Sequence, residues 1–242
     1  MSKTLDRIAI LSNVHTLMCD HKGEAGDLPP HHIRQNLMNA HTKENEGDRT
    51  PATGTKVVGQ GGRRYLTENE VLSLIGAALS GRHGARDACL IFWMYRRGWR
   101  VSEACALQLG DIDLDARVVY VRRKKNGTPT THPIALDEYK ALRAWLKVRE
   151  GYKGSAGPAV FLSERGDVLD RRQVNVMLAK CGERAGLSVR PHPHMLRHAC
   201  GYSLANAGHD TRAIQTYLGH RSITSTTIYT ETNVGRFMGF WG

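Results

Sequence analysis

The 242-residue chain lacks an apolar run long enough to cross a membrane. A transmembrane helix needs about 20 consecutive apolar residues, and no stretch approaches that length. The first fifteen residues, MSKTLDRIAILSNVH, include Asp6 and have neither a long apolar segment nor a small-residue cleavage site, so they do not resemble a signal peptide. We therefore expect a cytoplasmic protein with no membrane contact.

Cysteine is also scarce, and its spacing excludes two common uses. The chain has five cysteines, an odd number, and no two of them form a Cys-x-x-Cys pair. A disulfide framework needs paired cysteines, and a zinc ribbon needs closely spaced ones. We expect free, buried thiols at all of these positions: Cys19, Cys89, Cys105, Cys181 and Cys200.

Acidic residues are too few to balance the basic ones, because 34 Lys and Arg stand against 23 Asp and Glu, a net charge of +11. Residues 1–60 hold seven of each sign, so the whole surplus lies in residues 61–242. A positive field of this kind favours a polyanionic partner, and nucleic acid is the commonest one. Charge alone does not identify the partner.

The chain has no internal repeat, and its composition divides it into two parts. Residues 3–18 and 33–40 have short helical patterns, and residues 41–64 are polar and glycine-rich, as linkers are. We therefore expect a short N-terminal helical and linker segment over 1–64. A compact domain with a C-terminal tail is expected over 65–242.

The domain is predicted to be mainly α-helical with a small antiparallel β-sheet, an α+β class. Strands are expected at 118–121 and 130–134 around the turn signal Asn126-Gly127, with a further short strand at 159–163. Capping residues and apolar periodicity predict eight helices. They begin near Thr67, Ala85, Ser102, Asp137, Asp170, His192, Asp210 and Ser222.

Residues 191–200, PHPHMLRHAC, gather three histidines and an arginine. A metal site would use His194 and His198, four residues apart on one helical face. Met195 stands where a catalytic glutamate would follow, and Arg197 would put a fixed cation beside the metal. A phosphate site would use His194 and Arg197 near a helix N-terminus, which itself favours anions. Taken alone, the segment is more typical of an ordinary amphipathic helix, in which His192 and His198 are structural or support the neighbouring residues.

Three further segments carry side chains of related chemistry. Arg100 comes just before an expected helix start, where its guanidinium could share an anion with the positive end of the helix. Lys124 and Lys125 lie at the expected hairpin tip, and His220 lies between two helices, nine residues before Tyr229. Each of these residues alone is typical of a surface or packing position.

Together these segments resemble the catalytic domain of the tyrosine recombinases, also called phage integrases. The family pattern is an arginine in a G-x-R-x-S-E box, a hairpin lysine, H-x-x-R, L-G-H and a tyrosine. It is filled here in order over residues 65–231 by Arg100, Lys125, His194, Arg197, His220 and Tyr229. Spacing to Pro133 favours Lys125 over Lys124 as the hairpin lysine, and both stay open. The segment KKNGTPTTHPI and the compact size look most similar to the fimbrial phase-switch invertases.

The resemblance implies a site-specific DNA recombinase that cleaves and rejoins DNA through a 3′-phosphotyrosine intermediate. Tyr229 would attack the scissile phosphate, and Arg100 and Arg197 would hold its non-bridging oxygens. Because the covalent intermediate keeps the energy of the broken bond, no ATP is expected. The two arginines would take the role that metal ions play in many phosphoryl-transfer enzymes, so neither a metal ion nor another cofactor is expected.

The same resemblance assigns the proton transfers and the remaining phosphate contact. Lys125 would protonate the departing 5′ oxygen. His194 would be the general base, and His220 would donate a hydrogen bond to the phosphate.

The implied partners are double-stranded DNA with inverted-repeat sites, further copies of the chain in a tetramer, and accessory DNA-bending proteins. Fewer than 65 residues precede the domain, too few for the DNA-clamping domain of most integrases, so the role of 1–64 stays open. The apolar tail residues Phe237, Met238, Phe240 and Trp241 could pack on their own domain or on a neighbouring protomer. The family habit favours the neighbour.

The sequence leaves inversion, integration and excision open as outcomes. Two other functions are compatible with parts of the pattern: a type IB topoisomerase-like nicking-closing enzyme, and a non-catalytic DNA-binding regulator. The presence of Tyr229 argues against a regulator, because a protein that only binds DNA has no use for a nucleophile.

Overall fold

The computed structural model describes residues 64–123 and 129–231. The expected helices at 3–18 and 33–40, the linker, the Asn126-Gly127 turn and the C-terminal tail lie outside these ranges. Among the described residues, no helix combines the length and the apolar character that a membrane span requires.

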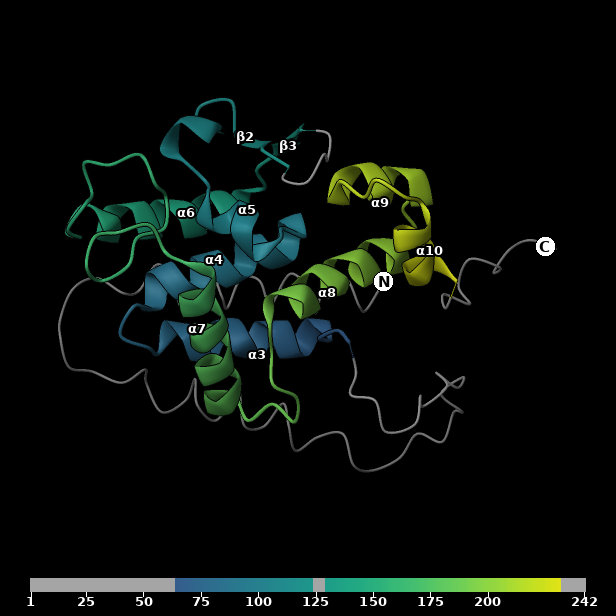
Figure 1. The fold of residues 1–242 in the computed structure, drawn as a ribbon, viewed down its shortest axis with the longest axis horizontal. Helices are drawn as coiled ribbons and strands as arrows, with labels where there is room; N and C mark the ends of the chain where they lie inside the picture. Colours follow the sequence, from purple (N-terminus) through teal and green to yellow (C-terminus); the bar gives the residue numbers. More distant parts are fainter. Residues whose placement is uncertain (1–63, 124–128, 232–242) are drawn as a thin grey trace. The chain divides into compact units, whose positions relative to one another are not determined.

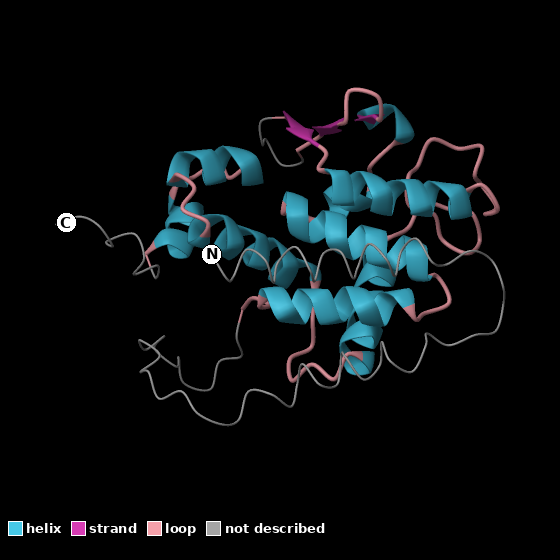
Figure 2. Ribbon diagram, turned by 180° about the vertical axis from the view of Figure 1, so that it is seen from behind, coloured by secondary structure: helices cyan, strands magenta, loops and turns pink. Residues whose placement is uncertain are grey.

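The described chain is mainly helical with one small sheet, as the sequence predicts (Figure 2). Its α-helices are α3 (Glu68–Leu79), α4 (Gly84–Arg97), α5 (Val101–Cys105), α6 (Leu136–Arg149), α7 (Arg171–Arg184), α8 (Pro193–Asn206), α9 (Thr211–Leu218) and α10 (Thr224–Thr230). A 3-10 turn, η1 (Leu109–Asp111), precedes the strands β1 (Ile112–Asp113), β2 (Val118–Val121) and β3 (Thr130–Pro133).

Helix α4 is the centre of the fold, and Figure 1 shows it between α6 and α3. It also packs against α8. Every residue from Ala88 to Tyr95 is buried. The apolar run in this segment predicts that result, because a helix that is apolar on all sides is stable only inside the protein. Gly98 ends the helix in the left-handed conformation, with φ of 57°, which residues without a Cβ adopt most easily.

The sheet has the strand order β1-β2-β3, and both pairings are antiparallel. Val119 faces His132 across the β2–β3 pair, and Val121 faces Thr130. This register confirms the two strands expected on either side of the Asn126-Gly127 turn. Strand β1 was not expected, and the residues of 159–163 form only isolated bridges, Gln108 with Ala159 and Leu162 with Val168.

Several helix caps agree with the sequence. Thr67 and Glu70 form the predicted capping box, and Asp170 and Asp210 cap α7 and α9 with their side chains. Three predicted caps are wrong. Arg100, not Ser102, precedes α5, and Ala135, not Asp137, precedes α6, because Glu103 and Glu138 reach back to those backbone N–H groups. Ile223, not Ser222, precedes α10.

The described cysteines are all free and buried, as expected: Cys89, Cys105, Cys181 and Cys200. Burial raises the pKa of the Cys181 thiol to about 11 and that of Cys200 to about 12. Both thiols are therefore protonated and unreactive at neutral pH.

Candidate active site

Arg197 lies in the second turn of α8, and its guanidinium is buried between two backbone turns. It donates to the carbonyl of Gly98, where α4 ends, and to the carbonyl of Leu218 at 2.8 Å, where α9 ends. Helix C-termini carry unsatisfied carbonyls and partial negative charge, so a cation is well placed there. Burial, followed by the neighbouring Arg100 cation, lowers the pKa of Arg197 to about 10, which leaves it charged at neutral pH.

Arg100 lies at the start of α5, two residues after the glycine turn that ends α4. Its guanidinium donates to Glu103 Oε1 at 2.9 Å, and Glu103 Oε2 accepts the backbone N–H of Arg100 at 3.0 Å. The Arg100 side chain keeps 27% of its surface exposed, whereas that of Glu103 is 2% exposed. Glu103 thus holds both the backbone and the guanidinium of Arg100, while part of the Arg100 side chain stays accessible to a ligand.

His220 follows the glycine turn that ends α9, in which Gly219 has φ of 66°. Its Nδ1 lies 2.8 Å from the hydroxyl of Thr226, a fully buried residue of α10. Burial, followed by the cations of Arg197, Arg100 and Arg123, lowers the pKa of His220 to about 4. The imidazole is therefore neutral at neutral pH and can act as a hydrogen-bond donor.

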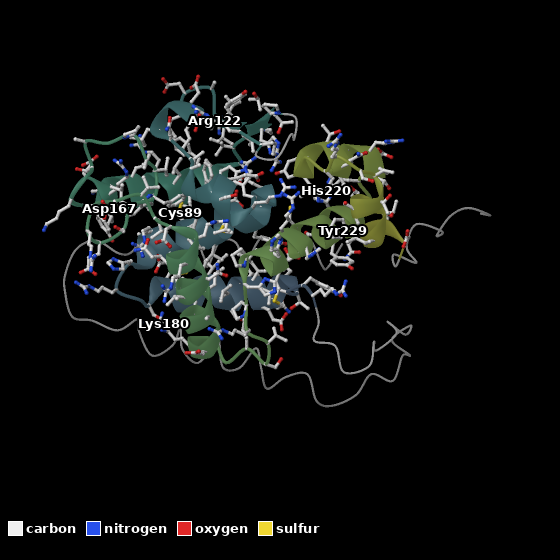
Figure 3. All side chains as sticks on the ribbon, viewed as in Figure 1. Cys89, Arg122, Asp167, Lys180, His220 and Tyr229 are labelled. Carbon is white, nitrogen blue, oxygen red and sulfur yellow. The ribbon has the colours of Figure 1, made fainter. Side chains whose placement is uncertain are left out.

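The side chain of Tyr229 projects from α10 into a socket lined by Tyr202, His220 and Gly201, and Tyr229 is only 1% exposed. Its ring packs against the rings of Tyr202 and His220, with centroids 5.1 and 6.2 Å away, and the latter pair is stacked. Its hydroxyl lies 3.0 Å from Nδ1 of His198 on α8. Figure 3 shows His220 and Tyr229 beside each other on the segment formed by α9 and α10.

Gly201 of α8 makes room for this ring. A Cβ at position 201 would lie 2.5 Å from two ring carbons of Tyr229. Burial raises the pKa of Tyr229 to about 12, although the Arg197 cation acts in the opposite direction. The hydroxyl is therefore protonated and poorly nucleophilic in this conformation.

The structure brings together four of the residues that the sequence predicted for the site. Arg100 and Tyr229 both perturb the pKa of Arg197, and Arg100 and Arg197 both perturb that of His220. His194 stands one turn before Arg197 on the exposed side of α8, and its ring lies 6.4 Å from that of His192. Burial, followed by the neighbouring His194, lowers the pKa of His198, so His194 borders the same cluster.

The predicted hairpin lysine, Lys125, lies outside the described residues, as does its alternative, Lys124.

Sequence reasoning missed part of the cluster. It left Glu103 and Arg123 without a role and took His198 as a structural or supporting residue. Two of the three had a detectable signal. Glu103 follows Arg100 at the spacing of a capping box, and Arg123 continues the alternation of buried residues that includes Val119 and Val121. The contact between His198 and Tyr229 spans 31 positions and has no local signal.

The chemistry open to this cluster is the binding and cleavage of a phosphodiester. Arg100, Arg123 and Arg197 lie close enough to act on one another, and Glu103 carries the only carboxylate that pairs with them within 64–123 and 129–231. Cations in such excess over anions favour a dianionic phosphorane-like transition state. Tyr229 is a candidate nucleophile beside Arg197, since each of the two acts on the pKa of the other.

The chain is similar in sequence to a known protein family and to curated members of it. The model of the phage integrase family matches residues 64–236. The type 1 fimbriae regulatory protein FimB of Escherichia coli K12 is 48% identical over 179 residues, which is 74% of this chain and 90% of FimB. The likeness therefore covers nearly the whole of that relative.

Two solved structures share the fold. The XerA recombinase superposes with a TM-score of 0.64 and 32% identity, over 73% of this chain and 63% of XerA. The XerH site-specific recombinase, bound to a palindromic difH substrate after cleavage, gives a TM-score of 0.61 and 25% identity. That match covers 72% of this chain and 51% of XerH, so this chain spans only about half to two thirds of these solved chains.

Proposed function

The chain belongs to the phage integrase family, and from this premise we infer that it is a site-specific DNA recombinase. It cleaves and rejoins DNA strands through a 3′-phosphotyrosine intermediate, and inversion of a DNA segment is the outcome that the likeness to the fimbrial proteins favours. The observation that carries this function is the clustering of Arg100, Arg197 and His220, with the ring of His220 stacked on that of Tyr229.

The reaction is a transfer of the phosphoryl group to the protein and back. The phenolic oxygen of Tyr229 forms a bond to phosphorus while the bond to the 5′ oxygen of the next nucleotide breaks. Arg100 and Arg197 neutralise the non-bridging oxygens, the role that metal ions play in many phosphoryl-transfer enzymes. Loss of one such charged donor should slow cleavage by about 10²–10³-fold. His220, neutral and held by Thr226, donates a hydrogen bond to the same phosphate.

Two protons must move during cleavage. The Tyr229 proton leaves to a base, a role we assign to His194, and the departing 5′ oxygen gains a proton, which we assign to Lys125. Attack by a 5′ hydroxyl from a second strand then reverses both steps. Since the phosphotyrosine keeps the energy of the broken bond, the cycle needs no ATP.

Tyr229 has to leave its socket before it can react. A hydroxyl on a residue that is 1% exposed and bonded to His198 cannot meet a phosphate of duplex DNA. We propose that DNA binding moves α10, which exposes Tyr229 beside Arg197.

The test is capture of the covalent intermediate. The wild-type chain and Tyr229→Phe are incubated with DNA from the source genome, and protein-linked fragments are isolated under denaturing conditions and sequenced. The wild type should retain fragments that share one inverted-repeat site, linked at Tyr229, and the variant should bind that site without linkage. Linkage in the variant would contradict the assignment.

A control separates recombination from simple nicking and closing. A plasmid with two captured sites should be inverted or resolved by the wild type, and a plasmid without sites should stay supercoiled. Relaxation of the plasmid without sites would instead support a topoisomerase-like enzyme.

Recombination needs four strands to be cut, so we propose that four copies of this chain assemble on two DNA sites. Accessory DNA-bending proteins would assist this assembly. We place the reaction in the cytoplasm. The C-terminal tail would join neighbouring protomers. Deletion of residues 235–242 should then reduce recombination far more than binding to a single site. An equal loss of both would contradict a role in assembly.

A further inference from the structure

Arg123 is a buried cation of the cluster, and no step of the reaction above uses it. Its side chain is 0% exposed. An unpaired guanidinium in such a place is costly, so a buried arginine needs charged or polar partners. Those partners tie it to two of the elements that carry the site.

The first partner is Glu103, whose Oε2 lies 3.2 Å from the guanidinium of Arg123. The same carboxylate holds the side chain and the backbone N–H of Arg100. Burial by itself would raise the pKa of Glu103, but the N–H of Arg100 and the Arg123 cation outweigh it and keep the pKa low. Glu103 is thus an ionised bridge between Arg100 and Arg123.

The second partner is the end of α9. Arg123 donates to the carbonyl of Tyr217, and Arg197 donates to the carbonyl of the next residue, Leu218. A Cβ at Gly219 would lie 2.8 Å from Nε of Arg123, so the arginine also packs directly against the turn. That turn points His220 toward Tyr229.

We propose that Arg123 is a positioning residue for strand cleavage, which fixes Arg100 through Glu103 and fixes the α9 turn that carries His220. This inference rests on the proposed function. Arg123 is assigned no phosphate contact, because its guanidinium already pairs with the carboxylate of Glu103, whereas the guanidinium of Arg197 donates to backbone carbonyls. Its loss would displace two phosphate-binding groups at once, and a displacement of about 1 Å can cost about 10²-fold in rate.

The test compares Arg123→Met with a matched control, Arg86→Met. Arg86 is also buried, and it also pairs with a carboxylate, that of Asp87, and with a backbone carbonyl, that of Leu162, but none of its contacts belongs to the site. Both variants lose a buried ion pair, so both should unfold more easily. The two variants should differ in the rate of DNA cleavage, because only Arg123 contacts residues of the site.

Cleavage is measured on a nicked duplex carrying the captured site, at saturating protein and at a temperature where all variants are folded. Arg123→Met should form the covalent adduct about 10²-fold more slowly, with the affinity for DNA within about twofold of wild type. Arg86→Met should cleave within about threefold of wild type. A wild-type rate in Arg123→Met, or an equal slowing in both variants, would overturn the proposal.

Arg123→Lys covers the case in which the methionine variant does not fold. Lysine keeps the buried cation but lacks the planar fork that reaches two acceptors, so cleavage should be intermediate. A wild-type rate in this variant would also count against Arg123.

One measurement does not depend on activity. The Arg123 cation contributes to the low pKa of His220, so NMR titration of DNA-free Arg123→Met should show that pKa moved upward, and Arg86→Met should not. If the wild type forms no adduct, the proposed function fails by itself, and this titration still decides whether Arg123 acts on His220. An unchanged His220 pKa would overturn the inference.

Discussion

At the scale of single residues, burial shifts the pKa values of Arg197, His220 and Tyr229 and so sets which of them carry a proton. Arg197 and Tyr229 are both nearly inaccessible, yet the proposed function requires Arg197 to bind a phosphate and Tyr229 to attack it. Their hydrogen bonds show how they are kept in place, since Arg197 joins two helix ends and Tyr229 is bonded to His198. In the DNA-free protein, the proposed nucleophile Tyr229 is therefore buried and bonded to His198.

The hydrogen bond between His198 and Tyr229 should be visible as a coupling energy. His198→Phe leaves a buried hydroxyl without its partner, which should lower the free energy of unfolding by about 1–3 kcal/mol. In Tyr229→Phe that hydroxyl is absent, so the same change should cost less. A double-mutant cycle by urea denaturation should give a coupling of about 0.5–1.5 kcal/mol, and strict additivity would show that the bond contributes nothing.

The buried histidine His132 predicts a pH dependence of stability. Burial lowers its pKa to about 3, well below the ordinary histidine value of 6.5, and its ring stacks on Tyr217. The folded state therefore binds fewer protons than the unfolded state between these two values. Stability due to neutral His132 is complete above pH 6.5 and is lost as the pH falls toward 3, by up to about 1.4 kcal/mol per unit.

His132→Phe keeps the ring and removes the titration. Denaturant unfolding of both proteins from pH 7 to pH 4 should show the wild type losing stability faster than the variant. Parallel curves would show that His132 is not neutral in the folded protein.

At the scale of elements, α8 organises the site because three of its neighbours meet on it. It packs against α4, which leads to Arg100, and against α9 and α10, which carry His220 and Tyr229. The short helix α10 has only seven residues, too few to be stable alone, so its packing against α8 holds it in place. A change at that contact should therefore release α10.

Gly201→Ala tests this contact. The added Cβ meets the Tyr229 ring at 2.5 Å, so overpacking should destabilise the protein by about 1–3 kcal/mol and speed hydrogen exchange in α10. The control is Gly76→Ala in α3, where nothing lies within 4 Å of the added Cβ. That substitution should stabilise the protein by up to about 1 kcal/mol, because alanine favours helix. Equal effects at both positions would exclude a specific contact.

At the scale of the whole molecule, charge and the active site point to the same partner. The surplus of +11 lies in residues 61–242, and the family model matches residues 64–236 of this region. Phosphate neutralisation releases counterions, so affinity for DNA depends steeply on salt.

Binding of Tyr229→Phe to the captured site, which avoids covalent trapping, should weaken by about 10³–10⁵-fold between about 50 and 200 mM salt if six to ten phosphates are contacted. A fluorescence anisotropy titration at several salt concentrations measures this slope. A flat dependence would contradict recognition through the DNA backbone.

The sequence by itself determined the family, the fold class and most element positions, because capping residues, glycine stops and apolar periodicity act over a few neighbouring residues. It also supplied the six candidate site residues in their order. Only the tertiary structure decided how Arg123 and Glu103 join Arg100 to the α9 turn, and that His198 holds the hydroxyl of Tyr229. These contacts join residues 20 to 94 positions apart, and they form only when α5, α8, α9, α10 and the sheet pack together, so no local pattern specifies them.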